Sequence, residues 1–89
     1  MQLEERVVDD VLARLRRIEG QVGGLIRMVE SGRECRDVVR QVSAASRALD
    51  QVGFKILACG LRACARDEQA AQRAGYTEEE LEKLFLQLA

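Results

Sequence analysis

Hydrophobic residues recur at alternating steps of three and four along two long stretches of the chain, residues 4–31 and 35–66. Alternation at every second residue, which would indicate a half-buried strand, is absent from both stretches. A three-four spacing gathers apolar side chains on one face of an α-helix, so the pattern predicts two long amphipathic helices. The predicted apolar stripes are Val8, Val11, Leu15, Ile18, Val22, Leu25 and Val29 in the first helix, and Cys35, Val38, Val42, Ala45, Leu49, Val52, Ile56, Cys59 and Ala63 in the second.

Two polar breaks delimit these helices. Ser31 and Gly32 interrupt the pattern and predict a tight hairpin, in which Gly32 suits a left-handed cap at the end of the first helix. Ser31 with Glu34 also fits a capping box for the second helix, and the sequence leaves both interpretations open. Further along, Thr77 and Glu80 form a capping box that predicts a short third helix. The apolar face of this third helix is Leu81, Leu84, Phe85 and Leu88.

Two further features concern helix packing and helix length. Gly20, Gly23 and Gly24 lie inside the first predicted helix, where each glycine costs up to about 1 kcal/mol relative to alanine. We expect them to mark a close approach between helices, with a kink as the alternative. The polar, alanine-rich segment 67–75 is compatible with a continuation of the second helix.

Composition supports a single all-α domain over residues 1–89. Hydrophobic residues make up 47% of the chain and aromatic residues 3%, without proline or tryptophan, which is typical of a helical bundle. A chain of 89 residues buries a modest core, and two amphipathic helices in one hairpin leave apolar surface uncovered. We therefore expect a homo-oligomer.

Other features bound the class of protein. The N-terminal stretch MQLEERVVDD is acidic and no apolar run approaches transmembrane length, so we expect a cytoplasmic protein without a signal peptide or a membrane partner. Its three cysteines, an odd number, are expected to be reduced thiols rather than a disulfide framework. The chain has no histidine, and hence neither the usual general base near neutral pH nor an imidazole metal ligand. We do not expect an enzyme.

The formal net charge of −1 hides an asymmetry along the chain. Residues 14–66 carry eleven Lys and Arg against five Asp and Glu, a balance of +6, whereas residues 67–89 carry two against six, a balance of −4. Ten of the eleven cations are arginine, the side chain best suited to phosphate and to guanine edges. This distribution indicates a partner with a phosphate backbone, although arginines taken singly also suit a solvated helix face.

Cys35 and Cys64 lie near the two ends of the second predicted helix, 29 residues apart. On a continuous helix their Cα atoms are about 43 Å apart, whereas a disulfide needs Cα atoms within about 7 Å. The two thiols therefore cannot meet within one chain. Two antiparallel copies of the helix, however, bring Cys35 of one protomer beside Cys64 of its partner, twice per dimer.

Local charge favours the thiolate form at both positions. Cys35 lies in the first turn of its helix between Arg33 and Arg36, and Cys64 is bracketed by two further arginines, Arg62 and Arg66. The alternative is that the cysteines are small core residues. We prefer that alternative for Cys59, which lies on the apolar stripe, and the inter-subunit site for the other two.

The stretches ARLRRIEGQVGGLIRMVESGRECRDVVRQVSAASRALD and GFKILACGLRAC resemble the copper-sensitive operon repressor (CsoR) family, over about residues 10–66. The resemblance implies all-helical bacterial repressors whose antiparallel hairpins, each with a short third helix, form four-helix-bundle dimers and dimer-of-dimers tetramers. Such proteins bind a GC-rich operator without a helix-turn-helix and release it when an inducer reaches the inter-subunit site.

The cysteines, together with one departure from the family's pattern, indicate which inducer to expect. The family's copper sensors use cysteines that match Cys35 and Cys64 and a histidine four residues before the latter, where this chain has Gly60. The chain therefore resembles most the histidine-lacking branch of CsoR-like sulfurtransferase repressors (CstR), in which the dithiol reacts with persulfide or polysulfide. No metal or other cofactor is then expected. The alternative is Cu(I) held by the same two thiolates, because this soft ion accepts linear coordination.

The resemblance also implies operator DNA as the partner, held by cations of the first two helices. The expected DNA-binding residues are Arg14, Arg16 and Arg17, followed by Arg40, Arg47 and Lys55. Outside this class, the remaining alternative is a helical scaffold that does not bind DNA.

Overall fold

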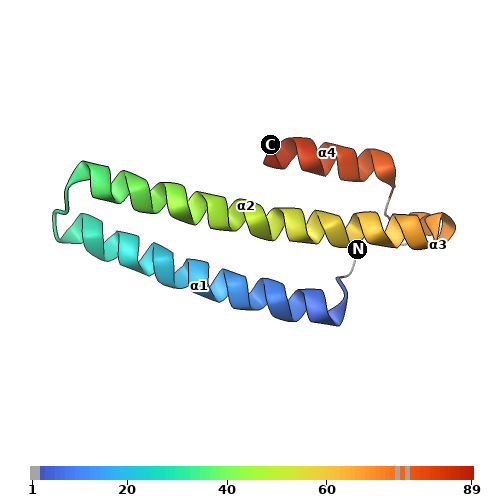
Figure 1. Cartoon of the computed structure of the whole chain (residues 1–89), viewed down its shortest axis with the longest axis horizontal. Coiled ribbons are helices and arrows are strands. Elements are labelled where there is room, and N and C mark those ends of the chain that lie inside the picture. Colours follow the sequence, from blue (N-terminus) through green and yellow to red (C-terminus); the bar gives the residue numbers. More distant parts are fainter. Residues whose placement is uncertain (1–2, 74, 76) are drawn as a thin grey trace.

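The structure, a computed structural model, describes residues 3–73, 75 and 77–89, apart from the side chains of residues 63, 64, 68 and 71. It contains four helices in this part of the chain: α1 (Glu5–Glu30), α2 (Cys35–Arg66), α3 (Glu68–Arg73) and α4 (Glu78–Leu88). α1 and α2 form a long antiparallel hairpin, and α4 lies along the side of α2 that faces away from α1 (Figure 1). The molecule is elongated, 54 × 25 × 14 Å. The predicted all-α hairpin with a short additional helix is confirmed.

The hairpin turn is a Schellman cap centred on Gly32, whose φ is +73°. The N–H of Arg33 donates to the carbonyl of Met28 (3.0 Å), and the N–H of Gly32 donates to the carbonyl of Val29 (3.2 Å). Ser31 donates its hydroxyl to the Met28 carbonyl at 3.2 Å, so its side chain serves the end of α1. Of the two capping interpretations, the structure supports the glycine cap.

The core between α1 and α2 is a narrow row of side chains. Val7, Val11 and Ile18 of α1 pack against Val52 and Cys59 of α2, each at most 9% exposed. The predicted stripe of α1 was wrong at its first position, where Val7 is buried and the adjacent valine is only half-buried. Much of the remaining predicted stripe is exposed, because α1 and α2 cover only a narrow part of each other's apolar face. The exposed members include Leu15, Val22, Val29, Val42 and Leu49.

The close approach between helices occurs at Gly53, where α4 packs on α2. A Cβ at Gly53 would lie 2.7 Å from a methyl of Leu88, so an alanine there would require the Leu88 side chain to shift. At Gly20, by contrast, nothing lies within 4 Å of an added Cβ. The expectation that the α1 glycines mark a close approach is therefore wrong within this chain. At Gly23 and Gly24 only the side chain of Arg27 comes near.

The segment after α2 does not continue that helix. The carboxylate of Asp67 accepts a hydrogen bond from the N–H of Ala70 at 3.0 Å and begins the separate helix α3. The hydroxyl of Thr77 accepts from the N–H of Glu80 at 3.1 Å, which confirms the predicted start of α4. α4 then packs on α2 through a small cluster that contains Leu57, Leu81, Leu84 and Leu88. Among the described residues, none of the helices combines enough length and apolar character to span a bilayer.

Candidate functional site

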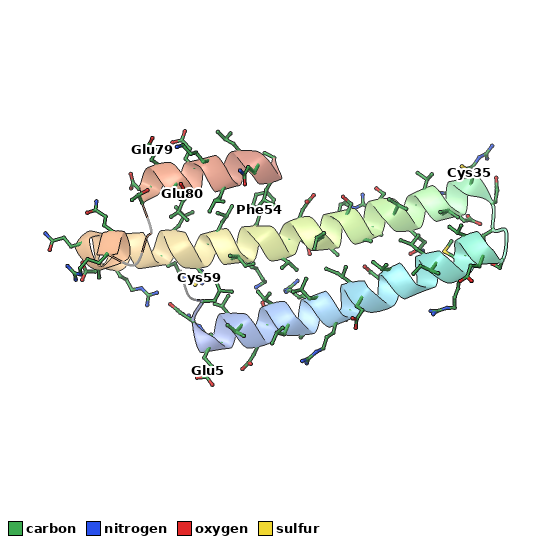
Figure 2. All side chains as sticks on the ribbon, turned by 180° about the vertical axis from the view of Figure 1, so that it is seen from behind. Glu5, Cys35, Phe54, Cys59, Glu79 and Glu80 are labelled. Carbon is green, nitrogen blue, oxygen red and sulfur yellow. The ribbon has the colours of Figure 1, made fainter. Side chains whose placement is uncertain are left out.

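Cys35 is the first residue of α2 and lies exposed at the hairpin end of the molecule (Figure 2). Its two flanking arginines are each within ion-pair distance of a carboxylate. Arg33 Nη2 lies 3.6 Å from Asp37 Oδ2, and Arg36 Nε lies 3.7 Å from Glu34 Oε1. The positive charge expected around this thiol is therefore partly neutralised, and what distinguishes Cys35 is its exposure at a helix start.

Cys59 has the opposite environment. It is 3% exposed and belongs to the core cluster that also contains Val7, Val11 and Val52. Figure 2 shows it on the side of α2 that faces α1. The interpretation of Cys59 as a core residue agrees with this placement.

Cys64 belongs to the last turns of α2, and its side chain lies outside the described residues. Because α2 runs unbroken from Cys35 to Arg66, the two predicted sensing cysteines are about 43 Å apart in one chain. The helix therefore keeps these two cysteines of one chain apart, and a meeting between subunits stays a prediction. Within the described part of a single chain, no three histidine, cysteine, aspartate or glutamate side chains are grouped so as to hold a metal ion.

The two sides of the hairpin differ in chemistry. On one side, which we name the apolar flank, Leu15, Val22, Ile26, Val42 and Leu49 are between 37% and 56% exposed. At 3.6 residues per turn, Leu49 lies about 60° to one side of the core residue Val52. Cys35, fourteen residues before Leu49 and hence almost four turns away, lies on this same flank.

The other side, the polar flank, carries the ionic residues. Lys55 lies about 60° to the opposite side of Val52, and its Nζ is 3.0 Å from Asp10 Oδ2 on α1. Its members on α1 are Asp10, Arg14, Arg17 and Gln21, and those on α2 are Gln51 and Lys55. Three of the six predicted DNA-binding cations, Arg14, Arg17 and Lys55, are thus brought to one side of the hairpin. The other three, Arg16, Arg40 and Arg47, are exposed and lie about 120° or more from the core residues Ile18 and Val52 of their helices.

Sequence reasoning missed the members of the polar flank that are not cations. Gln21 and Gln51 line a hollow of about 150 Å³ together with Arg14 and Arg17. Asp10 contacts Arg14 through an i, i+4 pair at 3.3 Å, a spacing that the sequence does reveal. Its contact with Lys55 depends on the register between the helices, which the sequence alone does not show.

The pKa values of two carboxylates, that of Asp10 on α1 and that of Glu4 just before this helix, are lowered by cations of α2. The hydrogen bond with Lys55, aided by the charge of Arg14, holds the pKa of Asp10 below its ordinary value, although partial burial acts the other way. The pKa of Glu4 is lowered mainly by its hydrogen bond from Arg66, with Arg6 contributing charge. Both carboxylates therefore stay ionised at neutral pH and tie the open end of the hairpin together.

Comparison with known proteins identifies relatives of this chain. The family model for the metal-sensitive transcriptional repressor matches residues 8–87, beyond the segment that carried the sequence resemblance. The chain is 37% identical over 77 residues to the copper-sensing transcriptional repressor CsoR of Bacillus subtilis, covering 86% of this chain and 73% of that one. It is 47% identical over 49 residues to the copper-sensing repressor RicR of Mycobacterium tuberculosis, covering 55% of this chain but only 51% of RicR.

A solved structure that resembles this fold is also that of a copper-sensing repressor. The copper-sensing repressor CsoR of Geobacillus thermodenitrificans, crystallised with Cu(I), is 36% identical, with a TM-score of 0.68 over 96% of this chain and 85% of that chain. The fold and the matches define a metal-sensitive transcriptional repressor. The chain belongs to this family, the CsoR family. The expectation of a repressor rather than an enzyme is confirmed at the level of the family, whereas the relatives, named as copper sensors, do not support the persulfide-sensing branch.

Proposed function

We propose that this protein is a DNA-binding transcriptional repressor whose affinity for its operator is controlled by Cu(I) at a site shared between two subunits. The ligands are Cys35 of one protomer and the partner subunit's Cys64. The family match and the copper-sensing relatives support the repressor and its metal. The observation that carries the shared site is the exposed Cys35 at the start of an unbroken α2.

The apolar flank supports the assembly that such a site needs. If residue 35 of one chain lies beside residue 64 of the other, the two-fold axis passes near position 49.5, the midpoint of 35 and 64. Leu49, at this midpoint, lies on the apolar flank and is 51% exposed. Two hairpins joined there form a four-helix bundle that covers the exposed apolar side chains. Pairing of two such dimers gives the tetramer expected for the family.

The donor set suits Cu(I) rather than a harder metal. The chain contains no histidine, and Gly60 occupies the position at which the family's copper sensors carry one. Thiolates are soft ligands, and two of them hold Cu(I) in linear coordination. Each chain would contribute one deprotonated thiol, from Cys35 of one protomer and the partner subunit's Cys64, and Cu(I) held by both would link one α2 to the other.

The missing histidine also favours a second candidate, a repressor of the same fold that senses reactive sulfur. The Cys35 thiolate attacks a terminal sulfur of a polysulfide, forms a Cys35 persulfide and releases a polysulfide shorter by one sulfur. The partner subunit's Cys64 thiolate then attacks the Cys35 sulfur, forms the inter-subunit disulfide and releases hydrosulfide. Both candidates use the same pair of thiols and differ in the bridge that joins them.

DNA binding is assigned to the cations of the hairpin. When the apolar flank is covered by a second copy, the polar flank remains free for the phosphate backbone, to which arginine and lysine contribute most of the affinity. The proposed DNA-binding residues are Arg14, Arg16, Arg17, Arg40, Arg47 and Lys55. A repressor that binds an operator acts where the DNA is, so we propose a cytoplasmic location.

A mobility-shift titration tests the proposal. The reduced protein is bound to the DNA upstream of its own gene and is then titrated separately with Cu(I) and with a polysulfide. Cu(I) is expected to release the DNA from the wild type and from Cys59→Ala, the control, but not from Cys35→Ser. Release by polysulfide alone would favour the second candidate, and absence of any DNA binding would contradict both.

A further inference from the structure

In the free protein, one carboxylate forms ion pairs with two of the proposed DNA-binding cations. Asp10 Oδ2 lies 3.0 Å from Lys55 Nζ of α2 and 3.3 Å from Arg14 Nε of its own helix. The three side chains are between 31% and 45% exposed, so the cluster lies at the surface of the polar flank, open to a partner. Among the described residues, no other carboxylate lies within ion-pair distance of these two cations.

The same cations line two adjoining hollows between α1 and α2. The first, about 150 Å³, is lined by Arg14, Arg17, Gln21 and Gln51 together with two apolar side chains. The second, about 350 Å³, includes Arg14, Gln51 and Lys55. Guanidinium, ammonium and amide groups all donate hydrogen bonds, and both hollows share Arg14 and Gln51. This arrangement suits an oxyanion that accepts several hydrogen bonds, of which the phosphate of a DNA backbone is the relevant one here.

We propose that Asp10 competes with the DNA backbone for Lys55 and Arg14, so that a phosphate must displace its carboxylate before it binds these two cations. The inference rests on the proposed DNA binding and adds to it a residue that limits affinity. A carboxylate and a phosphodiester each carry one negative charge, so both are suited to pair with the same two cations. Asp10 is tethered beside the cations, whereas the phosphate must be brought from solution.

The charge state of Asp10 agrees with this role. Its lowered pKa keeps the carboxylate ionised at neutral pH, so that the competitor is present whenever the protein meets DNA. Arg17, by contrast, lines the first hollow without a carboxylate within ion-pair distance among the described residues. Arg17 is therefore available to the first phosphate, while Lys55 and Arg14 become available only as Asp10 leaves.

The test compares two isosteric substitutions on adjacent residues. Asp10→Asn removes the competitor, and Asp9→Asn removes an exposed carboxylate that forms none of the described ion pairs, so both raise the net charge by one. Binding to a 20-base-pair duplex is measured by fluorescence anisotropy without copper, over a series of KCl concentrations. We expect Asp10→Asn to bind about three- to tenfold more tightly than Asp9→Asn, with a salt slope steeper by about one.

Two additional variants separate competition from a merely structural tether. In a Lys55→Gln background, Asp10→Asn should increase the affinity for DNA by clearly less than it does in the wild type. Asp10→Ala, which favours the helix, repeats the test if the asparagine variant melts below the assay temperature. Equal affinities of the Asp10 and Asp9 variants, with the wild type still binding, would overturn the inference alone. A wild type that binds no duplex would overturn the proposed DNA binding as well.

Discussion

Cys35 and Cys59 lie on the same helix, but the first is exposed at its N-terminus and the second is 3% exposed in the core against α1. Figure 2 shows them at distant points of α2, one at the hairpin end and one beside the first turns of α1. Exposure to solvent therefore distinguishes the two thiols: Cys35 can contact a ligand or a second subunit, whereas Cys59 packs in the core.

This difference predicts unequal labelling of the two thiols. Treatment of the reduced, native protein with a small alkylating reagent should modify Cys35 at least tenfold faster than Cys59, because the reagent must reach the sulfur. Mass spectrometry of peptides taken over time measures both rates. In a denaturant the two rates should become similar, and equal rates in the native protein would contradict the placement of Cys59.

A pair of glycine substitutions tests the packing of α4. Gly20→Ala should raise the free energy of unfolding by about 0.5 to 1 kcal/mol, because the added methyl meets nothing and alanine favours the helix. Gly53→Ala should fail to give this gain or should lower the stability, because its Cβ collides with Leu88. Urea unfolding followed by circular dichroism measures both, and an equal gain at the two positions would show that α4 does not pack as described.

The Asp10–Lys55 ion pair predicts a dependence of stability on pH. Because the pKa of Asp10 is lower in the folded protein than in the unfolded chain, the pair stabilises the fold above about pH 4 and loses this contribution as the pH falls through the folded value. The melting temperature of Asp10→Asn should therefore fall less between pH 5 and pH 2 than that of the wild type. Asp9→Asn is the matched control and should keep the acid dependence of the wild type.

The apolar flank predicts which substitution separates the subunits. Leu49→Glu places a charge near the proposed two-fold axis and should shift the protein towards a monomer at micromolar concentration, because the glutamate would be buried without a partner. Gln51→Glu introduces the same side chain on the polar flank and should leave the oligomer intact. Sedimentation velocity reports both, and a Leu49→Glu protein that remains assembled would move the interface elsewhere.

Local features were predictable from the sequence and long-range ones were not. Gly32 and Thr77 could be assigned because a helix cap involves residues three to five apart. The close approach at Gly53 was missed because it depends on where α4 docks, and the rest of α2 and the whole of α3 separate α4 from this glycine in the sequence. Asp10 was missed as a partner of Lys55 because the two residues are 45 positions apart in the sequence. Their contact depends on the register between two packed helices, which cannot be read from the sequence of either helix alone.

The apolar stripes show the same limit. The spacing predicted which side chains are apolar on each helix, but Ile18 is buried by the hairpin while Val22, one turn away, is 45% exposed. An apolar stripe that is wider than the contact with one helix can pack against two neighbouring helices. The sequence does not show which residues of the stripe face which neighbour. The position of Cys35 on the exposed part of this stripe is what connects the assembly with the proposed site.

Mixing two inactive variants tests the shared site most directly. Cys35→Ser and Cys64→Ser each lack both inter-subunit sites when pure, whereas a mixed dimer contains one complete site, with Cys35 from one chain and Cys64 from the other. The account predicts that neither pure variant binds Cu(I) tightly, and that the mixture, after subunit exchange, regains tight Cu(I) binding at about half a site per mixed-dimer chain. Tight binding by either pure variant, or no recovery in a mixture shown to contain mixed dimers, would contradict the account.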